Sequence, residues 1–404
     1  MDPLDPVRLA HRQIELDHEK TDRFPDLFAR KMGRMSASPL AFLRGAAPIF
    51  YDILAQKPEL REGPEGEGWL VGDAHLENFG AYRPESDGHS SKQAAKKVAG
   101  FNLNDFDETV VGPWRWDVLR LTTSLILGGR ELGADGTHVL GLAEKLLNAY
   151  VVAAFTNAKL PPTPRPVAAL IAQVNNRTKK ELLDARTVIQ KGQRRFVRGP
   201  RYRELTHEVR NAVARAFDIY VKALPKAERP RPEQLEILDA TLRIAGTGSL
   251  GSLRVAVLAR GKGGLDGNWI FDMKEQGVPS AARLLKAPKI DPAERVIEGF
   301  RACVQHPPKM LGTTKLGGRS MFVRRLAPQE DKLDLLHLRD ADLESLATYL
   351  GALLGAGHAR GKTRAPKRAW SANDLDRTLD RAIATAGMHE AIYLALCKLA
   401  RAEA

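Results

Sequence analysis

The pattern of apolar and polar positions divides the chain into two helix-rich ends and a strand-rich middle. Apolar residues recur at steps of three and four, the period of an α-helix, along much of the chain before residue 190 and again after residue 340. Between residues 237 and 275, short apolar runs are instead separated by glycine-rich turns, which is typical of antiparallel strands. The pattern predicts three parts: a mainly helical region over 1–230, a small β-rich region over 231–330, and further helices over 331–404.

The same pattern bounds individual elements. The apolar positions after Ser38 predict one amphipathic helix over 39–54, with Ser38 as its N-cap. The segment 68–71 is short and apolar, as expected for a strand, and the polar segment 82–99 is expected to form a hairpin or a mobile loop. The other predicted helices cover 6–19, 24–32, 118–127, 136–155, 167–190, 292–304 and 340–360, and the other strands cover 241–244, 253–258, 269–274, 311–316 and 320–326.

A candidate catalytic loop follows the strand 68–71. Gly72 allows the backbone to turn sharply, and Asp73 precedes Asn78 by five positions, the spacing between the catalytic base and a metal-binding amide in protein kinases. A phosphoryl acceptor needs a carboxylate near its hydroxyl proton, and a magnesium ion needs an oxygen ligand close by. We therefore interpret Asp73 as the base and Asn78 as a metal ligand. Each of them taken singly is also a common turn residue, and His75 is either a catalytic residue or a structural one that binds the loop backbone.

Two acidic segments follow this loop. Residues 101–108 read Phe-Asn-Leu-Asn-Asp-Phe-Asp-Glu, so that alternating apolar positions lead to a carboxylate cluster. Asp105 is the expected metal ligand, because Asp-Phe here resembles a metal-binding Asp-Phe-Gly, and Asp107 is the alternative ligand. Residues 112–121 then read Gly-Pro-Trp-Arg-Trp-Asp-Val-Leu-Arg-Leu. In this segment Asp117 is also placed to be the N-cap of the following helix.

These three segments resemble those of aminoglycoside phosphotransferases and choline kinases. Those families write the catalytic loop as His-Gly-Asp-x-His-x-x-Asn, and the present chain has Gly72, Asp73, His75 and Asn78, with Val71 at the place of the first His. They continue with Gly-Asp-Pro-x-x-Asp-Leu-Ala, which is similar to 112–121. The resemblance implies that the aspartate of the last segment, Asp117 in this chain, braces the catalytic loop.

The strand-rich middle contains a candidate nucleotide site. Its first two strands are joined by a glycine-rich loop, and Lys274 ends the third strand. The loop precedes a strand rather than a helix, which excludes a dinucleotide-binding site of the Rossmann type. In the kinase arrangement, backbone amides of such a loop approach the ATP phosphates and the lysine holds the α- and β-phosphates; the alternative is an ordinary hairpin with an exposed lysine. The loop residues concerned are Gly246, Thr247, Gly248, Ser249 and Gly251.

The helix over 292–304 carries Glu294 and Glu298, and kinase resemblance implies that one of them pairs with Lys274, with a slight preference for Glu298. In kinases the small lobe comes before the catalytic loop, whereas here it comes after. The resemblance therefore implies a bilobal protein kinase-like fold of the α+β class that is circularly permuted, a change that neighbouring chain termini permit. It has a mainly helical large lobe, to which 331–404 returns, and a small antiparallel-sheet lobe.

The order of these motifs is also similar to that of a bacterial family catalogued as domain of unknown function 2252. The similarity extends over nearly the whole chain and includes the Gly-Asp-Ala-His loop at 72–75, Asn-Asp-Phe-Asp-Glu at 104–108, Gly-Ser-Leu-Gly at 248–251 and His-Ala-Arg at 358–360. This resemblance implies no particular activity. The kinase interpretation therefore depends on the motifs.

The net charge of +13 is concentrated in one place. Residues 177–203 contain ten Lys or Arg against two acidic residues, a net charge of +8. Such a cluster is typical either of a surface that binds nucleic acid or another anionic partner, or of a solvated basic face. Two cysteines, Cys303 and Cys397, are too few for a disulfide framework. With no signal-peptide core or bilayer-length apolar run expected, we predict a cytoplasmic protein without membrane contact.

Together these features favour an ATP-dependent phosphotransferase that uses Mg²⁺ and acts on a hydroxyl of a small molecule. Three alternatives remain open. The first is a pseudokinase or interaction module that binds nucleotide without turnover, and the second is a metal-dependent phosphoesterase that uses the Asp-Ala-His of the catalytic loop. The third is a nucleic-acid-binding protein that uses 177–203.

Overall fold

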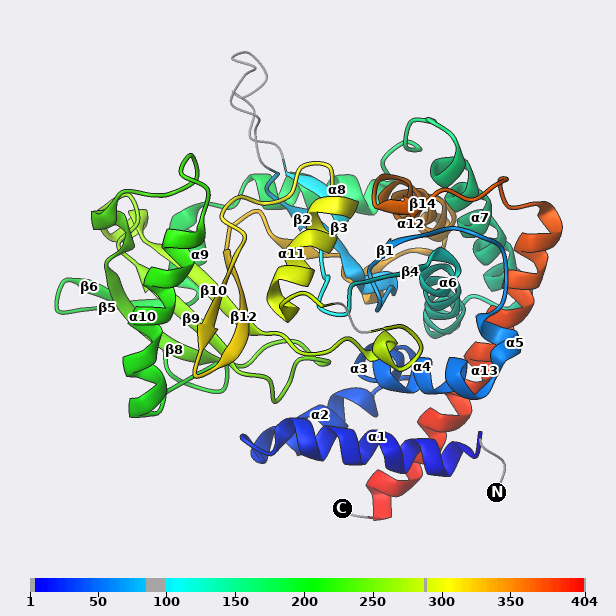
Figure 1. Cartoon of the computed structure of the whole chain (residues 1–404), viewed down its shortest axis with the longest axis horizontal. Helices are drawn as coiled ribbons and strands as arrows, with labels where there is room; N and C mark the ends of the chain where they lie inside the picture. Colours follow the sequence, from blue (N-terminus) through cyan, green and yellow to red (C-terminus); the bar gives the residue numbers. More distant parts are fainter. Residues whose placement is uncertain (1–3, 85–98, 287–288, 403–404) are drawn as a thin grey trace.

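The computed structural model describes residues 4–84, 99–286 and 289–402 and has the predicted mixed α+β composition, with several small antiparallel sheets. Most of the polar segment predicted as a hairpin or mobile loop lies outside the described residues. In Figure 1 a six-stranded sheet occupies one side of the molecule, a group of long helices occupies the other, and the first helices lie below both. The hydrophobic cores among the described residues follow this division: one lies among the long helices, and two smaller ones include residues of the six-stranded sheet.

The N-terminal part contains more helices than the pattern predicts. The predicted helix over 39–54 is two helices, because the chain breaks at Ala46, whose φ and ψ are −119° and 45°. Pro48 follows in the first turn of the second helix, where a proline is tolerated but could not continue a preceding helix. Ser38 caps the first of the two, as predicted, by accepting a hydrogen bond from Ala41 N–H. The helices are α1 (Pro6–Thr21), α2 (Asp26–Met35), α3 (Pro39–Gly45), α4 (Ala47–Gln56) and α5 (Pro58–Arg61).

Long helices surround the larger core, and α6 is buried along most of its length. By length and composition α7 could cross a membrane, so the expectation that no apolar run reaches that length is wrong for this helix. It packs against α12, however, and its buried side chains, including Leu142 and Leu146, belong to the core. The helices of this group are α6 (Trp114–Glu131), α7 (Gly136–Phe155), α8 (Arg165–Asn175), α12 (Asp340–Arg360) and α13 (Ala372–Ala402).

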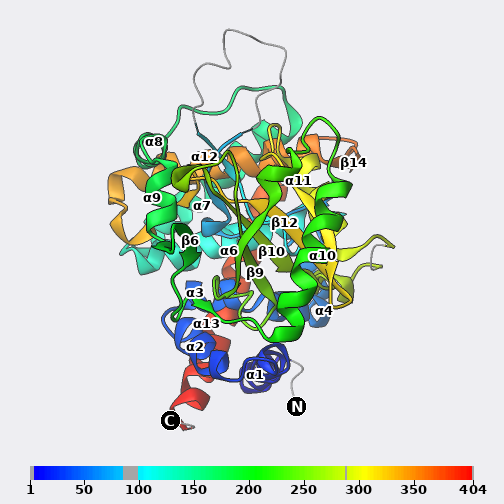
Figure 2. The ribbon, with the colours of Figure 1, turned by 90° about the vertical axis from the view of Figure 1, so that its left-hand side faces the viewer.

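The six-stranded sheet is antiparallel throughout, in the order β11-β12-β10-β9-β8-β7. Helix α10 (His207–Ala223) covers one face, as Figure 2 shows, and Phe217 packs edge-on against Phe271 of the sheet at 5.0 Å between ring centroids. Because β7 and α10 belong to this unit, it begins before residue 231, the predicted boundary. Its strands are β7 (Tyr202–Arg203), β8 (Ile237–Arg243), β9 (Arg254–Ala259), β10 (Trp269–Glu275), β11 (Gly312–Leu316) and β12 (Arg319–Arg325).

The predicted helix over 167–190 is wrong in its second half. After α8, a capping box at Thr178 begins the short helix α9 (Lys179–Asp184), and a hairpin of β5 (Thr187–Gln190) and β6 (Gln193–Phe196) follows. The β-branched run of Thr187, Val188 and Ile189 favours a strand, and Lys191 and Gly192 both have positive φ, as a tight hairpin turn requires.

Two three-stranded sheets carry the catalytic and acidic segments between the helices and the large sheet. One has the order β14-β1-β4 and the other the order β13-β2-β3, and all neighbours are antiparallel. Helix α11, which follows β10 in the chain, packs against β1 of the first of these sheets and against β11 and β12 of the large sheet. These elements are β1 (Glu67–Leu70), β2 (Phe79–Tyr82), β3 (Gly100–Leu103), β4 (Val110–Pro113), α11 (Pro292–Cys303), β13 (Asp331–Lys332) and β14 (Lys362–Arg364).

The core histidine His389 makes the stability depend on pH. It is fully buried beside Phe42 and Phe50, and neither ring nitrogen has a hydrogen-bond partner among the described residues. Burial, with a further effect of the Arg120 charge, lowers its pKa to about 3. Between pH 6.5 and 3 the unfolded chain therefore binds a proton that the folded chain does not. Stability from this group falls as the pH falls, by about 2 kcal/mol between neutral pH and pH 5.

We expect His389→Leu to abolish this contribution. The variant should gain about 2 kcal/mol over the wild type at pH 5 and much less at pH 7, measured by urea unfolding at both values. His11→Leu, at an exposed position of α1, is the control and should leave the pH dependence unchanged. An equal stability change at both pH values would mean that packing, and not protonation, dominates at His389.

Candidate active site

The loop after β1 is held firmly by its backbone. Asp117 of α6 accepts hydrogen bonds from the backbone N–H of Val71 at 2.6 Å and of Gly72 at 3.0 Å. The Tyr51 hydroxyl donates a hydrogen bond to the carbonyl oxygen of Gly72 at 2.6 Å. Gly72 has a φ of 82°, and a Cβ there would lie 1.9 Å from the carbonyl oxygen of Glu108, so that a larger residue would displace the loop. The predicted brace is confirmed.

Asp117 also connects this loop to the helical core. It is fully buried, and its Oδ2 lies 3.2 Å from Nε2 of His358, near the end of α12. The other ring nitrogen of His358 lies 3.0 Å from the hydroxyl of Tyr150 on α7. The alternative role of Asp117 as an N-cap is wrong, because α6 begins three residues earlier, at Trp114. One carboxylate therefore connects the candidate catalytic loop to three helices.

Asp73 follows the braced turn and is held by a buried arginine. Arg120, one turn after Asp117 on α6, donates a hydrogen bond from Nε to Oδ1 of Asp73 at 2.7 Å and another from its Nη2 to the carbonyl oxygen of Leu43 at 2.8 Å. Burial raises the pKa of Asp73 to about 7 against the opposing charge of Arg120, and the negative charge of Glu108 raises it further. One-fifth of the Asp73 side chain remains exposed. Its carboxylate is therefore oriented, accessible and able to exchange a proton near neutral pH.

The two polar residues that follow Asp73 have different surroundings. The Nδ2 of Asn78 donates a hydrogen bond to the carbonyl oxygen of Asp73 at 2.6 Å, and its Oδ1 is buried without a hydrogen-bond partner among the described residues. Nδ1 of His75 accepts a hydrogen bond from the backbone N–H of Glu77 at 3.1 Å, and its Nε2 lies 3.8 Å from Oδ2 of Asp73. Burial lowers the pKa of His75 well below its usual value, so the ring is neutral. These contacts match the structural role of His75.

The acidic segment and the lysine of β10 meet directly. Lys274 forms an ion pair with Oδ2 of Asp107, whose other oxygen accepts a hydrogen bond from Gln276 at 2.9 Å. Burial lowers the pKa of Lys274 to about 8. Burial also raises the pKa of Asp105, but the positive charges of Lys274 and Lys332 outweigh it and hold that pKa below its usual value. Asp105 is therefore an anion without an ion-pair partner among the described residues, whereas Asp107 is already occupied.

These residues fit a magnesium ion of the kind that is bound with a nucleotide. The described residues contain no group of three His, Cys, Asp or Glu side chains that would hold a metal ion alone. Mg²⁺ in phosphoryl-transfer sites usually takes one or two protein oxygens and completes its coordination with phosphate oxygens and water. The unpartnered Oδ1 of Asn78 and the carboxylate of Asp105 are oxygens of this type. Asp107 fits this role less well, because Lys274 and Gln276 bind both of its oxygens.

The glycine-rich loop between β8 and β9 packs against the N-terminal helices. A Cβ at Gly251, whose φ is 94°, would lie 2.2 Å from the carbonyl oxygen of Lys20 in α1. On the other side of the loop, the Arg34 side chain of α2 donates a hydrogen bond to the carbonyl oxygen of Gly246. The loop lies between two strands, as predicted, and its position is fixed by residues from the other end of the chain.

The expected pairing of Lys274 with Glu294 or Glu298 is wrong. Both glutamates lie on the exposed side of α11, and Lys274 pairs with Asp107 instead. The charged residue of α11 that contacts the acidic segment is instead Arg295, which is buried. Its guanidinium donates hydrogen bonds to the carbonyl oxygens of residues 107, at 2.9 Å, and 109, and to that of residue 277 at 3.1 Å. Helix α11 therefore supports the site through a cation that binds backbone rather than through a carboxylate.

A cavity of about 500 Å³ unites most of the predicted site residues. Its opposite wall comes from α1, α2 and α3, where Asp17 and Lys31 form a buried ion pair. No motif in the sequence predicts this wall. The predicted residues that line the cavity are Asp73, His75, Asn78, Asp105, Asp107, Gly246, Thr247, Gly248, Ser249 and Lys274.

Comparison with known proteins assigns the chain to a family. A family described as an uncharacterized protein conserved in bacteria (DUF2252) matches residues 23–402. The chain belongs to this DUF2252 family. No curated protein and no solved structure matches it. The matched part of the DUF2252 chain includes every predicted site residue and leaves out α1, whose residues contribute to the opposite wall of the cavity.

In this DUF2252 protein the basic stretch 177–203 is partly neutralised, because four of its ten Lys and Arg pair with aspartates outside it. Arg194 is buried and pairs with Asp184 and Asp266, at 2.7 and 2.8 Å. Arg198 binds Asp239 at 3.0 Å. Further pairs join Arg177 to Asp331 and Arg203 to Asp26. Part of the excess charge of this stretch therefore contributes to the structure through ion pairs.

Proposed function

We propose that the protein is an ATP-dependent phosphotransferase that transfers the γ-phosphoryl group to a hydroxyl of a small molecule. The supporting observation is that a base, an unpartnered amide oxygen, an unpaired carboxylate, a lysine and a glycine-rich loop line a single cavity. Phosphoryl transfer requires positioned groups and charge neutralisation more than covalent chemistry by the protein. These residue types meet that requirement.

Each residue then has a definite task. Asp73 accepts a hydrogen bond from the acceptor hydroxyl and takes its proton, for which a pKa near 7 is suitable. Arg120 keeps that carboxylate oriented, and Asn78 and Asp105 would hold Mg²⁺. Bound Mg²⁺ would neutralise charge on the phosphates. Lys274 contacts the α- and β-phosphates, and Asp107 takes the place of the helix glutamate as its acidic partner.

The proposal includes a circularly permuted kinase-like fold. Three features support it: the lysine strand β10 lies between β9 and β12, the glycine-rich loop joins β8 to β9, and α11 follows the lysine strand. The hydrogen bonds of Asp117 to the backbone of the catalytic loop match the brace that the phosphotransferase resemblance implies. The sheet with its glycine-rich loop and the loop held by an aspartate are each common arrangements when taken alone. Their combination in one chain favours the kinase-like interpretation.

A pseudokinase is the second candidate, and one contact favours it. Lys274 is engaged by Asp107, and no glutamate of α11 contacts it, so the ammonium group is not displayed as in an active kinase. A protein with this arrangement could bind nucleotide without turnover. Release of ADP in the presence of Mg²⁺, ATP and a pool of metabolites distinguishes the two candidates, and release of phosphate from an ester without ATP would indicate a phosphoesterase instead.

Lys274→Met tests the nucleotide site. We expect the Kd for ATP with Mg²⁺, measured by calorimetry, to rise by about 10- to 100-fold, because one charged contact to phosphate is lost. Lys222→Met is the matched control, since Lys222 is exposed on α10 and pairs only with Asp218. Its Kd should remain that of the wild type. Failure of the wild-type protein to bind ATP would refute both the phosphotransferase and the pseudokinase.

A further inference from the structure

A second cavity, of about 270 Å³, has a charged lining that is entirely basic. None of its residues lines the first cavity. Like charges that converge in a concave site repel one another, and an anion bound there would relieve the repulsion. The lining residues are Arg83, Arg177, Lys179, Lys262, Arg325, Pro328 and Gln329.

Three of these cations form no ion pair within the described part of the chain: Arg83, Lys262 and Arg325. The guanidinium of Arg325 lies over the ring of Trp269 at 5.1 Å, a contact that orients it but leaves its hydrogen-bond donors available. Burial lowers the pKa of Arg325, and the nearby charge of Arg83 lowers it further. The carboxylate closest in sequence, Glu330, pairs with Arg324 at 3.4 Å. Glu330 is near enough to raise the pKa of Arg325, but it forms no ion pair with any of the three cations, so none of them is neutralised by direct contact in the described part of the chain.

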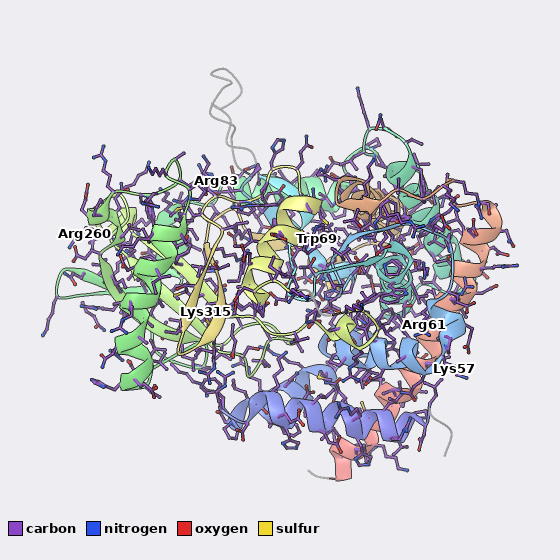
Figure 3. All side chains as sticks on the ribbon, in the orientation of Figure 1. Lys57, Arg61, Trp69, Arg83, Arg260 and Lys315 are labelled. Carbon is purple, nitrogen blue, oxygen red and sulfur yellow. The ribbon has the colours of Figure 1, made fainter. Side chains whose placement is uncertain are left out.

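The lining comes from separate parts of the fold. Arg83 follows β2, Lys262 lies in the turn between β9 and β10, and Arg325 ends β12. Figure 3 shows Arg83 on the upper side of the molecule, between the six-stranded sheet and the helices. Arg177, between α8 and α9, completes the lining and pairs with Asp331 of β13. A ligand in this cavity would therefore contact the six-stranded sheet and the helical part at once.

We propose that this second cavity binds a phosphate-bearing small molecule through Arg83, Lys262 and Arg325. Guanidinium groups offer paired donors that match phosphate oxygens, and the ammonium of Lys262 adds a point charge. The volume is just below the about 300 to 1,000 Å³ typical of sites for drug-sized ligands, which favours a compact anion over a polymer. Nucleic acid would need a continuous basic track, and the neighbouring Arg194 and Arg198 are committed to carboxylates.

The bound anion would also fix the relative position of two parts of the molecule. It would bridge the turn between β9 and β10 to the end of β2, a link that no side-chain contact between Lys262 and Arg83 can supply because both are cations. The ligand would in this way stabilise one arrangement of the sheet against the helices. This site is independent of phosphoryl transfer, and it could serve a phosphotransferase or a pseudokinase equally.

Calorimetric titration of the whole chain with pyrophosphate at physiological ionic strength tests the proposal. We expect saturable binding that the double variant Arg83→Gln, Lys262→Gln weakens by at least about tenfold, since charged hydrogen bonds are lost at two positions. The matched double variant Lys191→Gln, Arg201→Gln removes the same charge from exposed positions of the basic stretch 177–203 that do not line the cavity. Its affinity should stay within about twofold of the wild type.

Two further measurements separate this site from others. Lys274→Met should bind pyrophosphate as the wild type does, because Lys274 lies in the first cavity. Thermal unfolding of each variant, including Arg83→Gln alone, separates lost binding from lost folding. The proposal is overturned if both double variants weaken binding equally, if Lys274→Met abolishes it, or if the wild type does not bind. It is also overturned if a single-stranded RNA oligonucleotide displaces pyrophosphate and depends on Lys191 and Arg201.

Discussion

Asp73→Asn is expected to lower the rate of ADP release in the presence of acceptor by about 100- to 10,000-fold, the usual contribution of a general base. Asparagine has the same shape, and its side-chain oxygen still accepts the hydrogen bond from Nε of Arg120. It cannot take the proton of the acceptor hydroxyl. Because the proposed role of Asp73 is toward the acceptor rather than the nucleotide, the Kd for ATP with Mg²⁺ should change little. Initial rates and calorimetry on the same preparations measure the two quantities.

His75→Gln is the matched control for this experiment. His75 lines the same cavity and lies two residues from Asp73, but its Nδ1 is bonded to the loop backbone and its ring is neutral. Glutamine can retain an acceptor there, so the rate should fall by less than about tenfold. An Asp73→Asn variant with the wild-type rate would show that another group takes the proton, or that none is needed. An equal large loss in both variants would indicate a damaged loop rather than a missing base.

The candidate site could be predicted from the sequence only in part. Two features can be recognised in the sequence: the spacing between Asp73 and Asn78, and the glycine-rich loop. Both are short motifs, in which the local sequence largely determines the local backbone conformation. The meeting of these motifs in one cavity is predicted only through resemblance to phosphotransferases, since Lys274 lies 201 positions after Asp73 in the chain. The structure places both in the lining of that cavity.

The sequence analysis does not predict the two arginines that support the site, although the sequence context of one of them indicates that it is buried. Arg120 stands in a run of apolar and small residues on α6, where a lone charge must be buried and therefore paired. The sequence around Arg295 contains no comparable indication of burial. On α11 it lies one position after Glu294, and successive residues of a helix point about 100° apart. Spacing along the chain does not show which side of α11 faces the acidic segment, and for this reason it does not distinguish Arg295 from the two glutamates as the residue that supports the site.

The basic stretch illustrates a different limit. Its charge is evident from local composition, but the acids that neutralise it lie far away in the sequence. Asp239 and Asp266 belong to the β-rich region, and Asp331 begins β13. Local composition therefore overestimates the free positive charge there. The unpaired cations Arg83, Lys262 and Arg325, by contrast, are scattered singly along the chain, and only folding brings them together.

Asp117→Ala should produce the largest loss of stability, about 3 to 5 kcal/mol, because it removes one partner of a buried charged network. The substitution leaves the backbone N–H groups of Val71 and Gly72 and the Nε2 of His358 without their acceptor, in a region that water does not reach. Urea unfolding at neutral pH measures the change. Asp376→Ala, at an exposed position of α13, is the control and should alter stability by less than about 0.5 kcal/mol.

Asp117→Asn refines this prediction. Its single carbonyl oxygen can accept only part of the hydrogen bonding that two carboxylate oxygens provide, and its NH₂ group would face a backbone N–H. We expect a loss between those of the alanine variant and the control. Since the same bonds fix Gly72 immediately before Asp73, both Asp117 variants should also lower the rate of ADP release while Lys274 remains in place. If Asp117→Ala unfolded at the wild-type urea concentration, the brace would not hold the catalytic loop, and the orientation of Asp73 would have to depend on Arg120 alone.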